Sequence, residues 1–244
     1  MDTVLFELCA ESLEAALAGE SGGADRIELC AELACGGVTP DANVTIAALR
    51  ALSIPVHILI RPRPGDFVFS PSEFDLMKGQ IEQAKQAGAT GVALGMLSAD
   101  RTVDVKRSRA LVELARPMNA TFHRAFDETR DLHEALERVI ETGANNLLTS
   151  GGAANVLSGA ECLADLQRRA GGRINIIAGG GLRLESLAET VRRSGVFAVH
   201  GSLNRRNGQL KAEDGRKALE ADIRRAVQLL HDTYREQKVA TAAL

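Results

Sequence analysis

Two short apolar segments near the start of the chain each place a carboxylate and a thiol two residues apart. Glu7 precedes Cys9 in one segment, and Glu28 precedes Cys30 in the other. Side chains alternate between the two faces of a β-strand, so each carboxylate shares a face with its thiol. Carboxylates can exchange protons with a substrate. If the two segments are neighbouring strands, they bring two carboxylates and two thiols to one end of a sheet.

Further polar side chains follow two later apolar runs. Arg61 stands directly after the run Val56–Ile60, and His123 and Asp127 accompany the run Thr121–Ala125. One interpretation is catalytic: a carboxylate acts as general base, His123 as acid, and Arg61 binds an oxyanion or a carboxylate. The candidate catalytic residues are Glu7, Glu28, Arg61, His123 and Asp127.

A structural interpretation of the same charges stays open. Buried charges are costly unless they are paired. Glu7 and Glu28 could be neutralised by Arg61 and Arg124 in an internal network of salt bridges, without any catalytic role.

Glycines follow the last two apolar runs of the sequence. One run leads into Gly179–Gly181 and the other into Gly201-Ser202. Glycines permit tight turns, which is a sufficient explanation for either segment alone. Two such loops after neighbouring strands favour a cradle of backbone N–H groups for an anion such as phosphate. The predicted anion-binding residues are Gly180, Gly181, Gly201 and Ser202.

Eight such apolar runs alternate with helical stretches along the whole chain. They are Val4–Leu8, Arg26–Cys30, Val56–Ile60, Gly91–Leu94, Thr121–Ala125, Asn146–Thr149, Ile174–Ala178 and Val196–His200. Nearly continuous apolar runs are typical of parallel strands that are buried on both faces. The clearest helix start is Ser70, followed by Pro71 and a capping-box Glu73, and Gly88 ends that helix. An open doubly wound sheet usually has fewer strands, so the pattern favours a closed barrel.

The sequence therefore predicts one α/β domain, a (β/α)₈ TIM-type barrel over residues 1–244. In this fold the carboxyl ends of the strands form the functional face, where the residues named above would meet. We expect a mobile loop over Asn204–Arg216 and a frayed tail over residues 239–244.

Composition limits the class of protein. The net charge of −3, the absence of Trp and the single Tyr argue against a nucleic-acid-binding surface. No apolar run approaches the roughly 20 residues of a membrane span, and the first residues lack the basic region of a signal peptide. Four cysteines without a secretory signal indicate free thiols in a reducing compartment, so we expect a cytoplasmic protein.

From Phe6 to His200 the sequence resembles the CutC family, which is named for copper homeostasis. The resemblance rests on the segments Gly23–Cys30, Gly36–Pro40, Ile60–Phe67, Thr121–Asp127, Leu148–Gly151 and Ala178–Gly181. It implies a cytoplasmic barrel that forms homodimers, and a Cu(I) site at Cys9 and Cys30. This chain departs from the family pattern at Pro64, at Leu203 and after Asn207.

Three hypotheses follow for the function. The first is a copper-homeostasis protein of the CutC type, with Cu(I) bound by the strand-end cysteines. The alternative is a metal-free barrel enzyme that acts on a phosphorylated or otherwise anionic small molecule. The third is an interaction scaffold without chemistry of its own. Sequence alone leaves open whether the protein is an enzyme.

Overall fold

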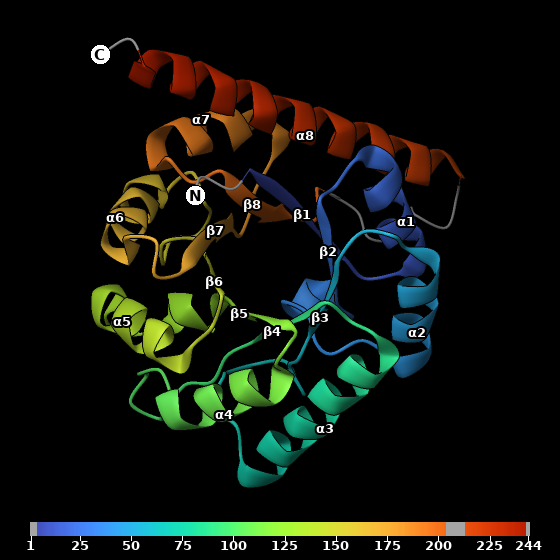
Figure 1. Cartoon of the computed structure of the whole chain (residues 1–244), viewed down its shortest axis with the longest axis vertical. Coiled ribbons are helices and arrows are strands. Elements are labelled where there is room, and N and C mark those ends of the chain that lie inside the picture. The colour runs from blue at the N-terminus through green and yellow to red at the C-terminus, as the bar shows by residue number, and fades with distance from the viewer. Residues whose placement is uncertain (1–3, 204–212, 243–244) are drawn as a thin grey trace.

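The computed structural model describes residues 4–203 and 213–242, and within them eight parallel strands close into one barrel in chain order. This confirms the predicted TIM-type barrel (Figure 1). The strands are β1 (Leu5–Ala10), β2 (Arg26–Leu29), β3 (Val56–Leu59), β4 (Gly91–Leu94), β5 (Asn119–Phe122), β6 (Asn146–Thr149), β7 (Asn175–Gly179) and β8 (Ala198–Gly201).

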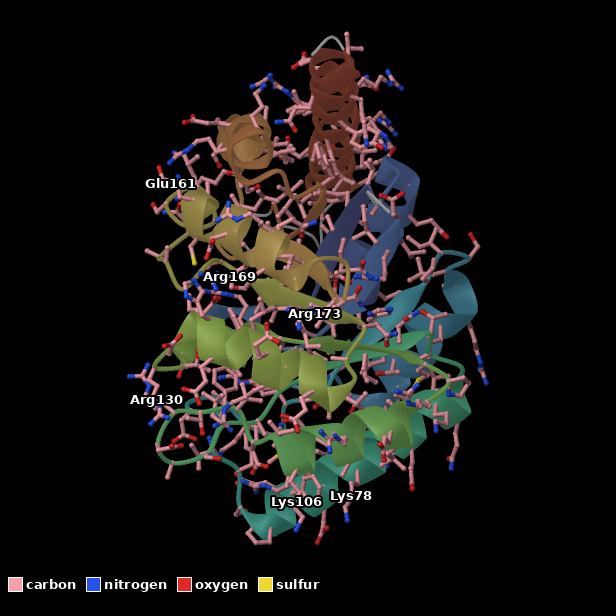
Figure 2. All side chains as sticks on the ribbon, turned by 60° about the vertical axis from the view of Figure 1, so that its left-hand side comes forward. Lys78, Lys106, Arg130, Glu161, Arg169 and Arg173 are labelled. Atoms are coloured by element: carbon pink, nitrogen blue, oxygen red, sulfur yellow. The ribbon has the colours of Figure 1, made fainter. Side chains whose placement is uncertain are left out.

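Helices surround the barrel as an outer ring (Figure 1). They are α1 (Leu13–Gly22), α2 (Ala42–Ala51), α3 (Pro71–Ala87), α4 (Val105–Ala115), α5 (Leu132–Thr142), α6 (Ala160–Ala170), α7 (Leu184–Ser194) and α8 (Glu213–Ala242). The predicted capping box of α3 is confirmed, since Ser70 and Glu73 each bond the other's backbone N–H. Charged side chains cover the outer surface of the helix ring, as Lys78 of α3, Lys106 of α4 and Arg169 of α6 show (Figure 2).

Alternation along the strands divides side chains between the barrel lumen and the helix layer. Phe6 and Leu8 of β1 pack outward into the large core between strands and helices. The intervening Glu7 and Cys9 point into the lumen, which also holds two small apolar clusters. In the β1–β2 register, Cys9 lies opposite Glu28, and Glu7 lies opposite Arg26. Neighbouring strands therefore bring these polar side chains together inside the barrel.

Two glycines make room for histidine rings in the lumen. A Cβ on Gly91 would lie only 2.3 Å from the ring of His57, and one on Gly95 would lie 2.8 Å from Nδ1 of His123. Side chains normally fill a barrel of this size with layers of branched apolar groups. Here Gly91 of β4 and Gly95 directly after β4 contribute no side chain, so bulky polar rings occupy the space.

Three sequence predictions about boundaries need correction. The fifth strand ends at Phe122 rather than at Ala125, because His123 caps a 3₁₀ turn (Arg124–Glu128) by accepting the N–H of Ala125. Residues 213–216 begin α8 instead of ending a loop, and residues 239–242 belong to the same helix. The remainder of the predicted loop and tail, 204–212 and 243–244, lies outside the described residues. Within the described part, no helix is both long and apolar enough to span a membrane.

Candidate functional site

A cavity of about 390 Å³ opens at the carboxyl ends of the strands. The predicted residues on its wall are Cys9, Glu28, Cys30, Arg61, His123, Asp127, Gly180, Gly181, Gly201 and Ser202. These residues lie in β1, β2 and β8 or follow β2, β3, β5, β7 and β8. They meet around one ligand-sized space. Glu7, which we also expected there, is not on the wall.

The two thiols lie in contact at the base of this cavity. Cys9 Sγ is 3.7 Å from Cys30 Sγ, and the side chains are nearly buried at 7% and 1% exposure. Cys9 Sγ also lies 3.8 Å from a carboxylate oxygen of Glu28. The hydrogen bond with Cys30, together with burial, raises the pKa of Cys9 well above its usual value. Without a bound cation, Cys9 is therefore a protonated thiol at neutral pH.

His200, at the end of β8, joins this pair. One donor atom each from Cys9, Glu28 and His200 lie within 4.8 Å of one another, a spacing that could hold a metal ion. His200 Nδ1 lies 2.8 Å from Glu7, and its Nε2 lies 4.0 Å from Glu28. Burial would lower the pKa of His200, but the nearby carboxylates of Glu28 and Glu7 raise it overall. The sequence analysis gave His200 no role. It is a polar residue at the carboxyl end of a strand, and the same signal identified the other candidate residues.

Glu7 lies beneath the cavity floor and is 1% exposed. It is bonded by His200 and by Arg26 Nε at 2.5 Å. Burial opposes its charge, yet Arg26 and His200 together hold the pKa of Glu7 well below its usual range. The predicted pairing of Glu7 and Glu28 with Arg61 and Arg124 is therefore wrong. Glu7 positions His200 rather than facing a ligand.

Glu28 has a different electrostatic environment from Glu7. It lies on the cavity wall, where burial raises its pKa to about 7 and the negative charge of Glu7 adds to this, against the attraction of His200. A carboxyl group with this pKa can accept or release a proton near neutral pH. Glu28 is thus the carboxylate of the site that is suited to proton transfer.

Arg61 and His123 supply hydrogen-bond donors on the cavity wall. The guanidinium of Arg61 lies 4.6 Å from the centre of the Phe67 ring, and the His123 ring centre is 5.0 Å from the same ring. Burial, with the nearby charge of Arg61, lowers the pKa of His123 to about 3. A neutral imidazole donates a hydrogen bond, so His123 is less suited to the acid role that we predicted.

Asp127 is saturated by its own neighbours. It accepts hydrogen bonds from Thr149 Oγ1 at 2.5 Å, from the backbone of Ser150 and Gly152 at 3.1 Å, and from Arg124 Nε at 2.9 Å. These bonds tie the turn after β5 to the loop after β6. The contacts favour a positioning role for Asp127 over a catalytic one.

The glycines on the wall have structural reasons to be glycine. Gly180 and Gly181 have φ angles of 117° and 63°, which side chains rarely adopt. A Cβ on Gly180 would lie 2.9 Å from Cζ of Arg124, and one on Gly201 would lie 3.2 Å from Leu182. Backbone angles and close neighbours thus account for the three glycines, and anion binding by Gly180, Gly181, Gly201 and Ser202 stays a prediction.

Comparisons with known proteins agree on one family. Residues 4–205 match the model of the CutC family. The chain is 46% identical over 202 residues to a CutC family protein of Chromobacterium violaceum, covering 83% of this chain and 81% of that protein. It is 44% identical over 196 residues to one of Mesorhizobium japonicum, covering 80% and 76%. The crystal structure of CutC from Streptococcus agalactiae, named for copper homeostasis, superposes with a TM-score of 0.78 at 28% identity, covering 83% of this chain and 100% of that one.

Proposed function

The chain belongs to the CutC family, and we propose that it is a copper-homeostasis protein that binds Cu(I) through Cys9 and Cys30. The observation that carries this proposal is the contact of the two thiols, 3.7 Å apart at the base of the cavity. Metal–thiolate bonds are about 2.3 Å long for zinc, so one ion of similar size can reach both sulfurs. Soft thiolates select Cu(I) over hard ions.

His200 supports the proposal as a third donor. Histidines that bind metals usually donate their other ring N–H to a carboxylate, which fixes the ring and its tautomer. The Glu7–His200 bond has this form and leaves Nε2 on the side of Glu28 and Cys9. Imidazole is a ligand that suits copper, so the donor set fits the ion that the family name implies.

Glu28 supplies a route for the thiol proton. A cysteine must lose its proton before it binds a metal ion. The Glu28 carboxylate lies 3.8 Å from Cys9 Sγ and, with a pKa of about 7, can accept that proton near neutral pH. We assign Glu28 this role in loading and releasing the ion.

We also propose that the protein works in the cytoplasm as a homodimer. The four cysteines are free, which is typical of proteins in a reducing compartment. The homodimer rests on the family resemblance, and sedimentation equilibrium tests it directly.

The test of the proposed function is a titration with Cu(I) under anaerobic, reducing conditions against a competing chelator. Cys9→Ser and Cys30→Ser should each weaken binding at least a hundredfold, because each removes one of two sulfur ligands. Cys162→Ser, on α6 away from the cavity, is the matched control. Unchanged affinity and stoichiometry in both variants would refute the site.

A second candidate function is favoured by the raised pKa of Glu28, which would make it a general base for an anionic substrate. In that case the metal-free protein should exchange substrate C–H protons with D₂O for some member of a panel of sugar phosphates and hydroxy acids. Glu28→Gln should abolish this exchange. If no member of the panel exchanges, the second candidate function is refuted and the copper proposal remains.

A further inference from the structure

The cavity is much larger than a metal ion requires. Its volume of about 390 Å³ would hold roughly a dozen water molecules. The sulfurs occupy its base, and Arg61 and His123 lie on another part of its wall, against Phe67. A ligand that filled the space would therefore touch the sulfurs as well as Arg61 and His123.

Arg61 presents a buried positive charge that has no carboxylate partner among residues 4–203 and 213–242. It is 5% exposed, and its two terminal nitrogens donate to backbone carbonyls of Cys35, Gly37 and Gly65. Among the described residues it makes no ion pair, and its buried Nε–H meets no acceptor. Burying an unpaired charge is costly, so the surroundings of Arg61 favour an anion in the cavity.

His123 presents a second unused donor on the same wall. It is 4% exposed, and its Nδ1 accepts the N–H of Ala125, which places the ring proton on Nε2. This Nε2–H is buried and has no acceptor within the part of the chain that the structure describes. Leaving a buried donor unsatisfied is unfavourable, so an acceptor atom from a ligand would be bound favourably.

We propose that the cavity receives Cu(I) as its complex with a small thiol that carries carboxylate groups, and that Arg61 and His123 bind a carboxylate of this carrier. The inference rests on the proposed function, because it assumes that Cu(I) is the cargo. A single-thiol carrier holds the ion more weakly than a pair of protein thiolates can, so the ion passes to the protein.

Transfer is a ligand exchange in which copper stays Cu(I). A bond forms from the ion to Cys9 or Cys30, and a bond from the ion to the carrier sulfur breaks. The cysteine proton ends on the carrier, which leaves as a free thiol. When the ion arrives with two carrier thiolates, the other cysteine displaces the second carrier in the same way, its proton leaves on that carrier as a free thiol, and no oxidant or reductant is needed.

The first experiment uses metal-free protein, so it tests the anion-binding end without copper. Mercaptosuccinate, a thiol with two carboxylates, and thioglycerol, a neutral thiol of similar size, are titrated by calorimetry. Mercaptosuccinate should bind at least tenfold more tightly. His123→Phe should reduce its affinity about tenfold or more, because the variant loses a hydrogen bond to a charged group. His133→Phe, on the exposed outer side of α5, is the matched control and should bind as the wild type does.

The second experiment measures the rate of Cu(I) uptake from each thiol complex. Wild-type protein should take Cu(I) from the mercaptosuccinate complex at lower concentration than from the thioglycerol complex, and His123→Phe should lose this preference. The comparison of carriers in wild type remains decisive if the variant does not fold. Equal binding of the two thiols would overturn the proposal, as would tight binding of inorganic phosphate without binding of mercaptosuccinate. Absence of Cu(I) binding in the chelator titration would instead refute the proposed function. The calorimetric result would still decide whether the cavity binds a carboxylate, because it is measured without copper.

Discussion

Glu7 holds His200 through a 2.8 Å hydrogen bond between its carboxylate and Nδ1, below the floor of the cavity. Arg26 bonds the other oxygen of the same carboxylate. The three side chains come from β1, β2 and β8, which are neighbours in the closed barrel. Closure of the barrel is thus what orients the imidazole, since β1 and β8 are adjacent only in the folded chain.

Glu7→Gln should destabilise the fold strongly. It leaves Arg26 as a buried charge without its partner, a change that typically costs about 3–5 kcal/mol. Urea denaturation followed by circular dichroism measures the loss. Glu161→Gln, on an exposed side chain of α6, is the control and should change stability by less than about 0.5 kcal/mol. Equal stabilities for the two variants would show that the buried ion pair does not form.

The stability difference between Glu28→Gln and wild type should depend on pH. The pKa of Glu28 is 4.5 in the unfolded chain and about 7 in the folded protein. Wild type therefore loses stability as pH rises through that window. Glutamine cannot ionise, and the variant avoids this loss. Its relative stability should grow by about 3 kcal/mol between pH 4.5 and 7 and stay level above 7. Denaturation at several pH values checks this, and a difference that is constant with pH contradicts the raised pKa.

Gly91→Ala should destabilise the barrel by about 1–3 kcal/mol, because the added methyl group overlaps the ring of His57. Gly79→Ala is the matched control, since a Cβ at this helical position meets no atom within 4 Å. It should stabilise the protein by up to about 1 kcal/mol through helix propensity. Thermal denaturation distinguishes the two signs, and a stable Gly91→Ala variant would mean that His57 lies elsewhere in the lumen.

Cu(I) affinity should rise with pH. The pKa of Cys9 is raised well above its usual value, so binding must displace its proton across the neutral range. The logarithm of the affinity should increase by at least about one for each pH unit between 6 and 8. Chelator competition at fixed copper gives the slope, after correction for protons bound by the chelator. A slope of zero would show that Cys9 keeps its proton and is not a ligand.

Sequence patterns were sufficient for the architecture because parallel barrel strands are buried on both faces. Each expected run, from Val4–Leu8 to Val196–His200, overlaps a strand of the barrel. The boundary at Thr121–Ala125 was misplaced because the side chain of His123 caps a turn, which ends the strand before it. A capping interaction of this kind depends on one side-chain rotamer, which periodicity does not contain.

The candidate residues were found by position, but their partners were not. Alternation placed Glu7 and Glu28 on inward faces, yet it could not show that Glu7 lies one layer deeper and pairs with Arg26. Arg26 is two residues before Glu28 and so shares its face, a signal that we did not use. The depth of a side chain in a barrel depends on the stagger between strands, which one sequence does not reveal.

X-ray absorption at the copper edge of the Cu(I)-loaded protein tests the central claim most directly, because it identifies the atoms bound to the ion. The account predicts two sulfur ligands in wild type and one nitrogen ligand from His200. Cys9→Ser and Cys30→Ser should each retain a single sulfur, and Cys162→Ser should retain both. A copper environment without sulfur, or one that is identical in wild type and the Cys9 and Cys30 variants, would contradict the proposed site.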